Sequence, residues 1–314
     1  MLQPPTAPSQ GYNGSGTNKN VGAMRNEGID IQAGYSKRDG DFKWSLNGVF
    51  GLARNTVVTL KPDGTNLLAQ TDPDFGGGSP TTSTVAGRSI AQFYGFVTEG
   101  IFQNTAEIAA HATQLPGTAP GDIKFKDING DGVINDNDRT WIGSYLPKFT
   151  YSLNYTASYK GFDASIFFQG SQGNQIFNGT RILTEGMARL FNASPVVLNA
   201  WTPTNTNTNV PRAINGNPNL NARISDRWVE DGSYLRLKNV IIGYTLPADA
   251  LGVLKKINLT KLRVYVSSQN LLTFTKYKGW DPEISGRGGN QSAGIDYGQY
   301  PSVRSFQFGL QASF

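Results

Sequence analysis

The sequence predicts an all-β fold in which about seven antiparallel strands form part of a large transmembrane β-barrel with long extracellular loops. Apolar and polar residues alternate with a period of two in several segments, and this pattern places successive side chains on opposite faces of a strand. Short turns and long connections also alternate along the chain, as they do in outer-membrane barrels. The polar faces carry mainly Ser, Thr, Asn, Gln and Gly, with few of the charges usual on soluble surfaces.

The composition suits a β protein with one apolar face. Charged residues make up 16% of the 314 residues, below the roughly 25% of soluble domains. The chain has 17 Phe, 13 Tyr and 37 Gly but no Cys, which excludes disulfides and cysteine chemistry. Its net charge of +5 is not gathered into a Lys/Arg cluster, so no nucleic-acid partner is expected. No run approaches the roughly 18 apolar residues of a membrane-spanning helix.

Strands are expected at seven positions along the chain. Phe149, Tyr151 and Leu153 begin an apolar series that alternates with Thr150 and Ser152. The other segments show the same alternation, most cleanly at the last strand. The predicted strands are at about 26–38, 42–54, 148–159, 162–175, 233–246, 261–274 and 302–314.

Local signals predict how these strands are joined. Asp39-Gly40 and Lys160-Gly161 are two-residue turns between the first two pairs of strands. In 233–246 the apolar phase changes between Leu237 and Val240, which predicts a bulge near Lys238-Asn239.

Long connections rich in Gly, Pro, Asn and Thr occupy about 55–147, 178–232 and 275–301. Compact soluble domains rarely have such loops, whereas outer-membrane barrels have long loops outside the cell and short turns at the periplasmic end. Aromatic residues beside the tight turns fit an interfacial girdle: Tyr35, Phe42, Tyr159 and Phe162. A β-sandwich also alternates, so a secreted, calcium-dependent carbohydrate-binding sandwich stays open as the alternative.

Seven is an odd number of strands, whereas bacterial single-chain barrels have even numbers. At least one further strand is therefore expected upstream, because an unpaired strand edge in lipid leaves backbone groups without hydrogen bonds. Met1-Leu2-Gln3-Pro4-Pro5 does not resemble a signal segment. We expect a fragment in which a signal peptide and a plug domain are absent.

One motif matches the calcium loop D-x-[DN]-x-[DN]-G, at 127–138. Asp127, Asn129 and Asp131 would supply oxygen ligands, followed by the carbonyl of Val133. Asp138 stands where an EF-hand has a bidentate Glu, and its shorter side chain reaches less far. An Asx-rich turn without metal is the alternative. We expect Ca²⁺ here and no other cofactor.

No catalytic set can be assembled, so an enzyme is not expected. His111 is the only histidine, and it is interpreted as a solvated surface residue. Four tryptophans in the long connections could stack on sugars, but we favour a role in pinning loops: Trp141, Trp201, Trp228 and Trp280.

Several segments resemble the SusC/RagA-type TonB-linked outer-membrane proteins. They include GDIKFKDINGDGVINDNDRTWIG at 121–143, DRWVEDGSYLRLKNVIIGYTLP at 226–247 and LRVYVSSQNLLTFTKYKGWDPEI at 262–284. The ending YPSVRSFQFGLQASF and the stretch 20–30 also match. The resemblance runs from about residue 20 to the end of the chain.

This resemblance implies a 22-stranded barrel of the Gram-negative outer membrane, of which the chain is the C-terminal part. It also implies import of oligosaccharides or peptides, a SusD-like surface lipoprotein as a lid, and drive from TonB-ExbB-ExbD through the missing N-terminal part. The terminal Phe314 resembles the family's barrel-assembly signal. Nothing in the sequence identifies the substrate.

Overall fold

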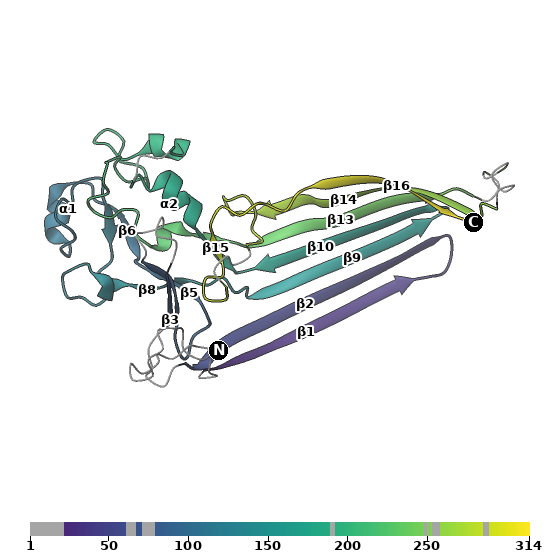
Figure 1. Cartoon of the computed structure of the whole chain (residues 1–314), viewed down its shortest axis with the longest axis horizontal. Coiled ribbons are helices and arrows are strands. Elements are labelled where there is room, and N and C mark those ends of the chain that lie inside the picture. Colours follow the sequence, from purple (N-terminus) through teal and green to yellow (C-terminus); the bar gives the residue numbers. More distant parts are fainter. Residues whose placement is uncertain are drawn as a thin grey trace, which may run out of the picture.

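A computed structural model describes residues 22–60, 67–70, 79–188, 192–247, 250, 252, 258–284 and 289–314. It shows a long sheet with a group of smaller elements at one end of it (Figure 1). The long sheet has seven strands, and the smaller sheets have four, three and two. Within these ranges, no helix is both long and apolar enough to cross a membrane.

The seven-stranded sheet is antiparallel throughout and confirms the predicted fold class. Each predicted range overlaps one of its strands. In sheet order the strands are β1 (Ala23–Lys37), β2 (Phe42–Thr59), β9 (Phe149–Tyr159), β10 (Phe162–Gln172), β13 (Tyr234–Thr245), β14 (Lys261–Thr275) and β16 (Ser305–Ser313).

Of the two expected two-residue turns, the one at Lys160-Gly161 is present, and so is the bulge. Lys37 pairs with Trp44, so the connection between β1 and β2 is longer than the two-residue turn predicted at Asp39-Gly40. Lys160 and Gly161 have φ of 45° and 89°, the left-handed conformations that a two-residue hairpin turn requires. Tyr159 and Phe162 therefore face each other directly. The register of β13 against β14 shifts between Leu237 and Asn239, which restores the apolar residues of β13 to one face. β10 ends earlier than expected, because Gly173 has a φ of 80° and breaks the strand.

The register joins the apolar faces of all seven strands into one surface. Ile31 on β1 pairs with Phe50, which pairs with Tyr151 on the next strand. At the other edge, Val266 pairs with Phe308. These side chains are exposed rather than covered by a second sheet, within the part of the chain that the structure describes. Large exposed residues on this surface include Ile29, Ile31, Tyr35, Phe42, Leu46, Phe50, Leu52, Leu153, Tyr159, Phe162, Ile242, Val264, Val266, Leu272, Phe274, Phe306, Phe308 and Leu310.

The opposite face is polar. Ser45 and Thr156 share a hydrogen bond across β2 and β9, with 2.7 Å between their hydroxyl oxygens. Arg263 on β14 forms a bidentate pair with Asp163 on β10, reaching across Gly243 of the intervening strand. A Cβ at Gly243 would lie 2.5–2.7 Å from the guanidinium, so glycine leaves the space that this ion pair occupies.

The long connections are not irregular coil, and we call their ordered part the cap. At one end of the sheet it gathers elements from all three long connections (Figure 1). They are β3 (Leu67–Gln70), β4 (Pro80–Thr84), β5 (Gln92–Gly95), β6 (Thr98–Ile101), α1 (Thr105–Ala110), β7 (Ile123–Phe125), η3 (Asp136–Asp138), β8 (Thr140–Gly143), β11 (Gln175–Asn178), α2 (Gly179–Glu185), η4 (Pro195–Asn199), η5 (Asp226–Trp228), β12 (Val229–Asp231) and β15 (Ile295–Asp296).

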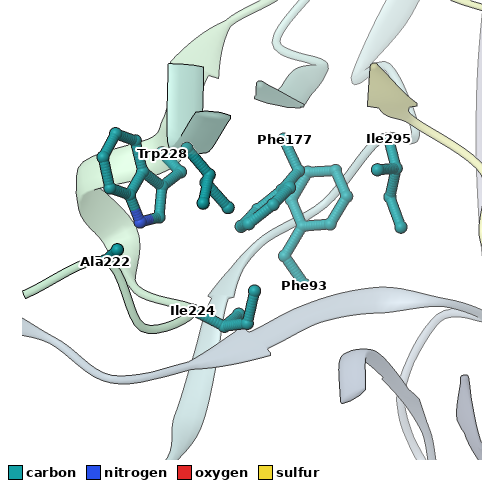
Figure 2. Close-up of a cluster of buried hydrophobic side chains, with 7 residues drawn as sticks. Phe93, Phe177, Ala222, Ile224, Trp228 and Ile295 are labelled. Atoms are coloured by element: carbon teal, nitrogen blue, oxygen red, sulfur yellow. The ribbon is translucent and has the colours of Figure 1, made fainter. Parts of the chain in front are cut away.

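Two hydrophobic cores hold the cap together. Figure 2 shows the larger one, in which Phe93 and Phe177 pack at 5.9 Å between ring centroids, with Trp228 and Ile295 nearby. The smaller core is built from Phe96, Ile123, Phe125 and Ile134. Burying aromatic and aliphatic surface gives the cap its own stability. The long sheet has no such core, since one of its faces is exposed.

Candidate functional site

The candidate site is the junction between the polar face of the long sheet and the cap. Arg236 on β13 lies there and is only 2% exposed. Its guanidinium donates to Asp281 Oδ1 at 2.6 Å and to Glu283 Oε2 at 2.7 Å. Burial acts to raise the pKa of Asp281, but the hydrogen bonds from Arg236, Glu283 and Ser302 together outweigh it, and the pKa lies below its ordinary value. A buried charge needs such partners, because an unpaired one is costly.

The two carboxylates also hold the connection between β14 and β16. Asp281 accepts hydrogen bonds from the backbone N–H of Ser302 at 2.7 Å and of Glu283 at 2.9 Å. Glu283 accepts from Lys238 Nζ at 2.9 Å and from the Tyr234 hydroxyl at 2.8 Å. This network, centred on Arg236, pins residues 281–283 and Ser302 of that connection to the polar side of β13.

A second charged cluster joins three elements of the cap. Arg181 on α2 pairs with Glu185 on its own helix and with Glu230 on β12, at 2.7 Å each. The Tyr277 hydroxyl donates to Asp296 Oδ2 at 2.5 Å. Burial, reinforced by the Asp296 carboxylate, raises the pKa of Tyr277 above its usual range. Tyr277 therefore stays protonated, and it acts as a donor and not as an acid at physiological pH.

A third buried network fixes the outer part of the cap. Asp122 is fully buried and accepts from Arg212 through two bonds of 2.8 and 2.9 Å. Asn221 donates to the same carboxylate at 2.9 Å, and Asn219 donates to Asn221 at 3.0 Å. Buried polar groups that are paired in this way fix a single arrangement of the chain. The cap is therefore a preorganised surface.

The predicted metal loop folds as a set of Asx turns. Asp127 accepts hydrogen bonds from the backbone of Gly130 at 2.7 Å and of Gly132 at 2.8 Å. These bonds, with that of Gly132 the strongest, hold the pKa of Asp127 below its ordinary value. Asn129 Nδ2 donates to Asp131 Oδ2 at 2.9 Å. The structure thus brings together the first three predicted ligands.

The last two predicted ligands have other local partners. The Val133 carbonyl, which is the predicted ligand atom, accepts from Asn135 Nδ2 at 3.4 Å. Asp138 is fully buried, and its two carboxylate oxygens accept from the amides of Ile128 at 2.9 Å and Asn135 at 2.8 Å. Over the described ranges, no group of three His, Cys, Asp or Glu residues could hold a metal. The donors at Asp127, Asn129 and Asp131 suit Ca²⁺ in chemistry, and the calcium site stays a prediction.

Two of the four loop tryptophans pin the cap. Trp228 is fully buried and donates to the carbonyl of Arg223, and Trp201 is 8% exposed and donates to Gln103. Trp141 is half-buried, whereas Trp280 is 78% exposed.

The interpretation of His111 as a solvated residue was wrong. Its ring packs edge-on to Phe102, 5.3 Å away, and lies 3.5 Å from Glu99. Its side chain is 15% exposed. Phe314 follows β16 and is 77% exposed at the end of the sheet opposite the cap (Figure 1). Its role as an assembly signal stays a prediction.

Sequence reasoning missed the network around Arg236. A usable signal was present, because Arg236 and Lys238 place two cations in a strand whose other polar positions are uncharged. Their carboxylate partners, Asp281 and Glu283, lie more than 40 residues later in the chain. Spacing alone could not pair them.

Comparisons with known proteins find relatives that match nearly the whole chain. TonB-dependent receptor P3 of Formosa agariphila is 40% identical over 304 residues, which cover 94% of this chain and 29% of that protein. TonB-dependent receptor P26 of the same organism is 32% identical, over 94% of this chain and 30% of that protein. TonB-dependent receptor SusC of Bacteroides thetaiotaomicron is 24% identical, with 94% and 27% covered. No family model matches.

Solved structures show the same fold. The RagAB peptide transporter superposes with a TM-score of 0.73 at 26% identity, over 99% of this chain and 31% of that chain. The RagAB peptide importer in its "open-open" state gives a TM-score of 0.74 at 25% identity, over 100% and 31%. The chain thus spans under a third of the length of the relatives that it matches. By sequence and by fold, this chain belongs to the SusC/RagA-type TonB-dependent receptors.

Proposed function

We propose that the chain forms part of the wall and the outer cap of a nutrient-import receptor in the Gram-negative outer membrane. The observation that carries the proposal is the apolar surface, which is continuous across seven strands and exposed. Such a surface is stable against acyl chains, provided that the backbone is paired within the sheet. The polar face then lines the interior, with the Arg236 network at its mouth.

The partners follow from the family. A SusD-like surface lipoprotein would close over the cap, and TonB-ExbB-ExbD would act through other parts of the full receptor. The substrate is an oligosaccharide or a peptide. The solved relative RagAB is a peptide transporter, which supports a peptide as the substrate. The rigid hydrogen-bonded networks of the cap support a role as a fixed platform for a lid.

The first test is the location and assembly of the full-length receptor that contains this chain. We expect an affinity-tagged receptor to fractionate with the outer membrane, to resist carbonate extraction, and to copurify with a lipoprotein. We also expect deletion of its gene to abolish growth on either a peptide mixture or a glycan, but not on monosaccharides or free amino acids. Recovery as a soluble periplasmic or secreted protein would refute the proposal.

The β-sandwich alternative has little support. A sandwich buries the apolar face of one sheet against a second sheet, about 10 Å away. Across the described residues, the three smaller sheets belong to the cap, while Phe308 and Phe306 on the long sheet are 87% and 61% exposed.

A further inference from the structure

The small sheet that contains β4, β5 and β8 has two unlike faces. Phe93 on β5 points into the larger core of the cap (Figure 2). The other face carries a row of polar and aromatic side chains. Ser83 on β4 lies opposite Gln92 on β5, and Tyr94 lies opposite Trp141 on β8. We call this second face the threonine–tryptophan face.

Several polar atoms on this face are buried without a partner. Thr81 Oγ1, Ser83 Oγ, Gln92 Oε1 and Trp141 Nε1 have no hydrogen-bond partner within the described ranges. Thr81 and Ser83 are 0% and 1% exposed. Buried polar groups are normally satisfied, so a cluster of unsatisfied ones calls for a bound group.

Two arginines lie against the same face without a carboxylate partner among the residues described. The Arg88 guanidinium lies 3.7 Å from the centre of the Trp141 ring, and that of Arg139 lies 4.9 Å from the centre of the Tyr94 ring. Arg139 donates to the carbonyls of Pro80 and Tyr94 through one terminal nitrogen, while its Nε has no partner. The face therefore carries two guanidinium groups and unpartnered hydroxyl and indole donors, beside one unpartnered acceptor, Gln92 Oε1. The Asp136 carboxylate acts on Arg139 electrostatically.

The face belongs to a hairpin that is fixed to the inner side of the long sheet. Asn55, on the polar face of β2, accepts a hydrogen bond from the amide of Ile90 at 2.9 Å. The backbone of Val57 exchanges bonds of 2.8 Å with Gly87 and Arg88. The hairpin of β4 and β5 thus lies on the side that the proposed function assigns to the substrate.

We propose that the threonine–tryptophan face is a subsite for a carboxylate group of the imported ligand. Guanidinium, indole N–H and hydroxyl donors together match an oxyanion. Arg88 is exposed and lies across Trp141, so its movement toward an incoming carboxylate uncovers the indole N–H. The carboxylate can come from a peptide or from a uronic acid. This inference rests on the proposed import function and specifies its substrate class.

The test uses the purified full-length receptor and four probes in titration calorimetry. Trialanine is compared with trialanine amide, and trigalacturonic acid with neutral galactotriose. We expect one acidic probe to bind at least about tenfold more tightly than its neutral counterpart, as hydrogen bonds to a charged group imply. Which acidic probe responds identifies the source of the carboxylate.

Variants separate the subsite from general charge. Arg88→Gln should weaken the acidic probe about tenfold and leave the neutral probe unchanged. Arg54→Gln is the matched control, because Arg54 is exposed on the opposite face of β2; it should change neither. Equal affinities for acidic and neutral probes, or equal effects of the two arginine variants, would overturn the proposal.

Removing the hydroxyl of Thr81 distinguishes a role in ligand binding from a purely structural role. Thr81→Val keeps the shape but removes an unpartnered buried group, so the free receptor should be at least as stable as the wild type while the acidic probe binds more weakly. Trp141→Phe should likewise weaken the acidic probe. A clearly lower unfolding midpoint for Thr81→Val would show that another part of the receptor already bonds this hydroxyl, against the proposal. Failure of the import function would appear separately, as a receptor absent from the outer membrane.

Discussion

Replacing Leu153 by Arg tests whether the apolar surface of the long sheet faces lipid. Leu153 lies on β9 next to Gly48, whose position leaves room, since a Cβ there would be 3.8 Å from Leu153 Cδ1. An arginine therefore fits sterically, and its cost is the transfer of charge into hydrocarbon. Asn154→Arg places the same charge at the same depth on the polar face, between Asn47 and Phe167.

The expected loss of stability follows from the depth of Leu153 in the membrane. Leu153 lies about six residues from Tyr159, whose ring marks one interface beside the turn. At about 3.3 Å per residue and a tilt of about 45°, this is about 14 Å, close to the middle of an apolar band about 25 Å tall. Leu153→Arg should therefore destabilise by about 2–4 kcal/mol, and Asn154→Arg by about 1 kcal/mol or less.

The assay is unfolding of the full-length receptor in lipid vesicles by guanidinium, followed by tryptophan fluorescence. The difference between the two variants is the informative quantity, because it cancels the general effect of an added charge. An Asn154→Arg receptor as unstable as the Leu153→Arg receptor, or less stable, would refute the assignment of the two faces.

Three further predictions concern the cap and its junction. Arg236→Leu leaves Asp281 and Glu283 without their buried cation and should lower the free energy of unfolding by about 3–5 kcal/mol; hydrogen exchange of the Ser302 amide should become faster, and an unchanged rate would contradict the pinning of Ser302. Because the folded pKa of Asp281 lies below its ordinary value, its contribution to stability is fully present well above the unfolded pKa of about 3.9 and is lost as the pH falls through the folded pKa; unfolding midpoints at pH 7 and about pH 5 should be similar, and the midpoint at about pH 3 should be lower. Asp127→Asn should abolish calcium binding at the 127–138 loop, measured by calorimetry on the metal-stripped receptor with CaCl₂; absence of binding heat in the wild type would show the calcium prediction to be wrong.

The strands of the long sheet were predictable because their signal is local. A period of two in β9 and β16 is sufficient to place each strand, and a change of phase at Leu237 is sufficient to place the bulge. The end of β10 was not predictable in this way. Gly173 sits within a run whose residues continue to favour a strand, and neither its positive φ nor the close approach of the Lys148 side chain can be read from the local sequence.

The cap was beyond local reasoning. Its larger core takes Phe93, Phe177, Trp228 and Ile295 from four separate segments, and no periodicity links them. The same holds for the pairing of Arg236 with Asp281. The calcium motif shows a different limit of sequence reasoning. Its spacing fits a known loop, but Asp138 is buried and its carboxylate oxygens already accept hydrogen bonds from backbone amides. A short motif specifies which residues are neighbours, but not which of their oxygens are free.

Over the described residues the long sheet has an odd number of strands, and this number decides which assemblies of the sheet can close. Six antiparallel pairings separate β1 from β16, so the two edge strands point the same way. Two copies set side by side in one membrane would meet in a parallel seam, which bacterial barrels of this kind do not use. Strand direction alternates all the way round a closed barrel only if an odd number of further strands lies between β1 and β16. Self-association of the sheet therefore cannot replace those further strands.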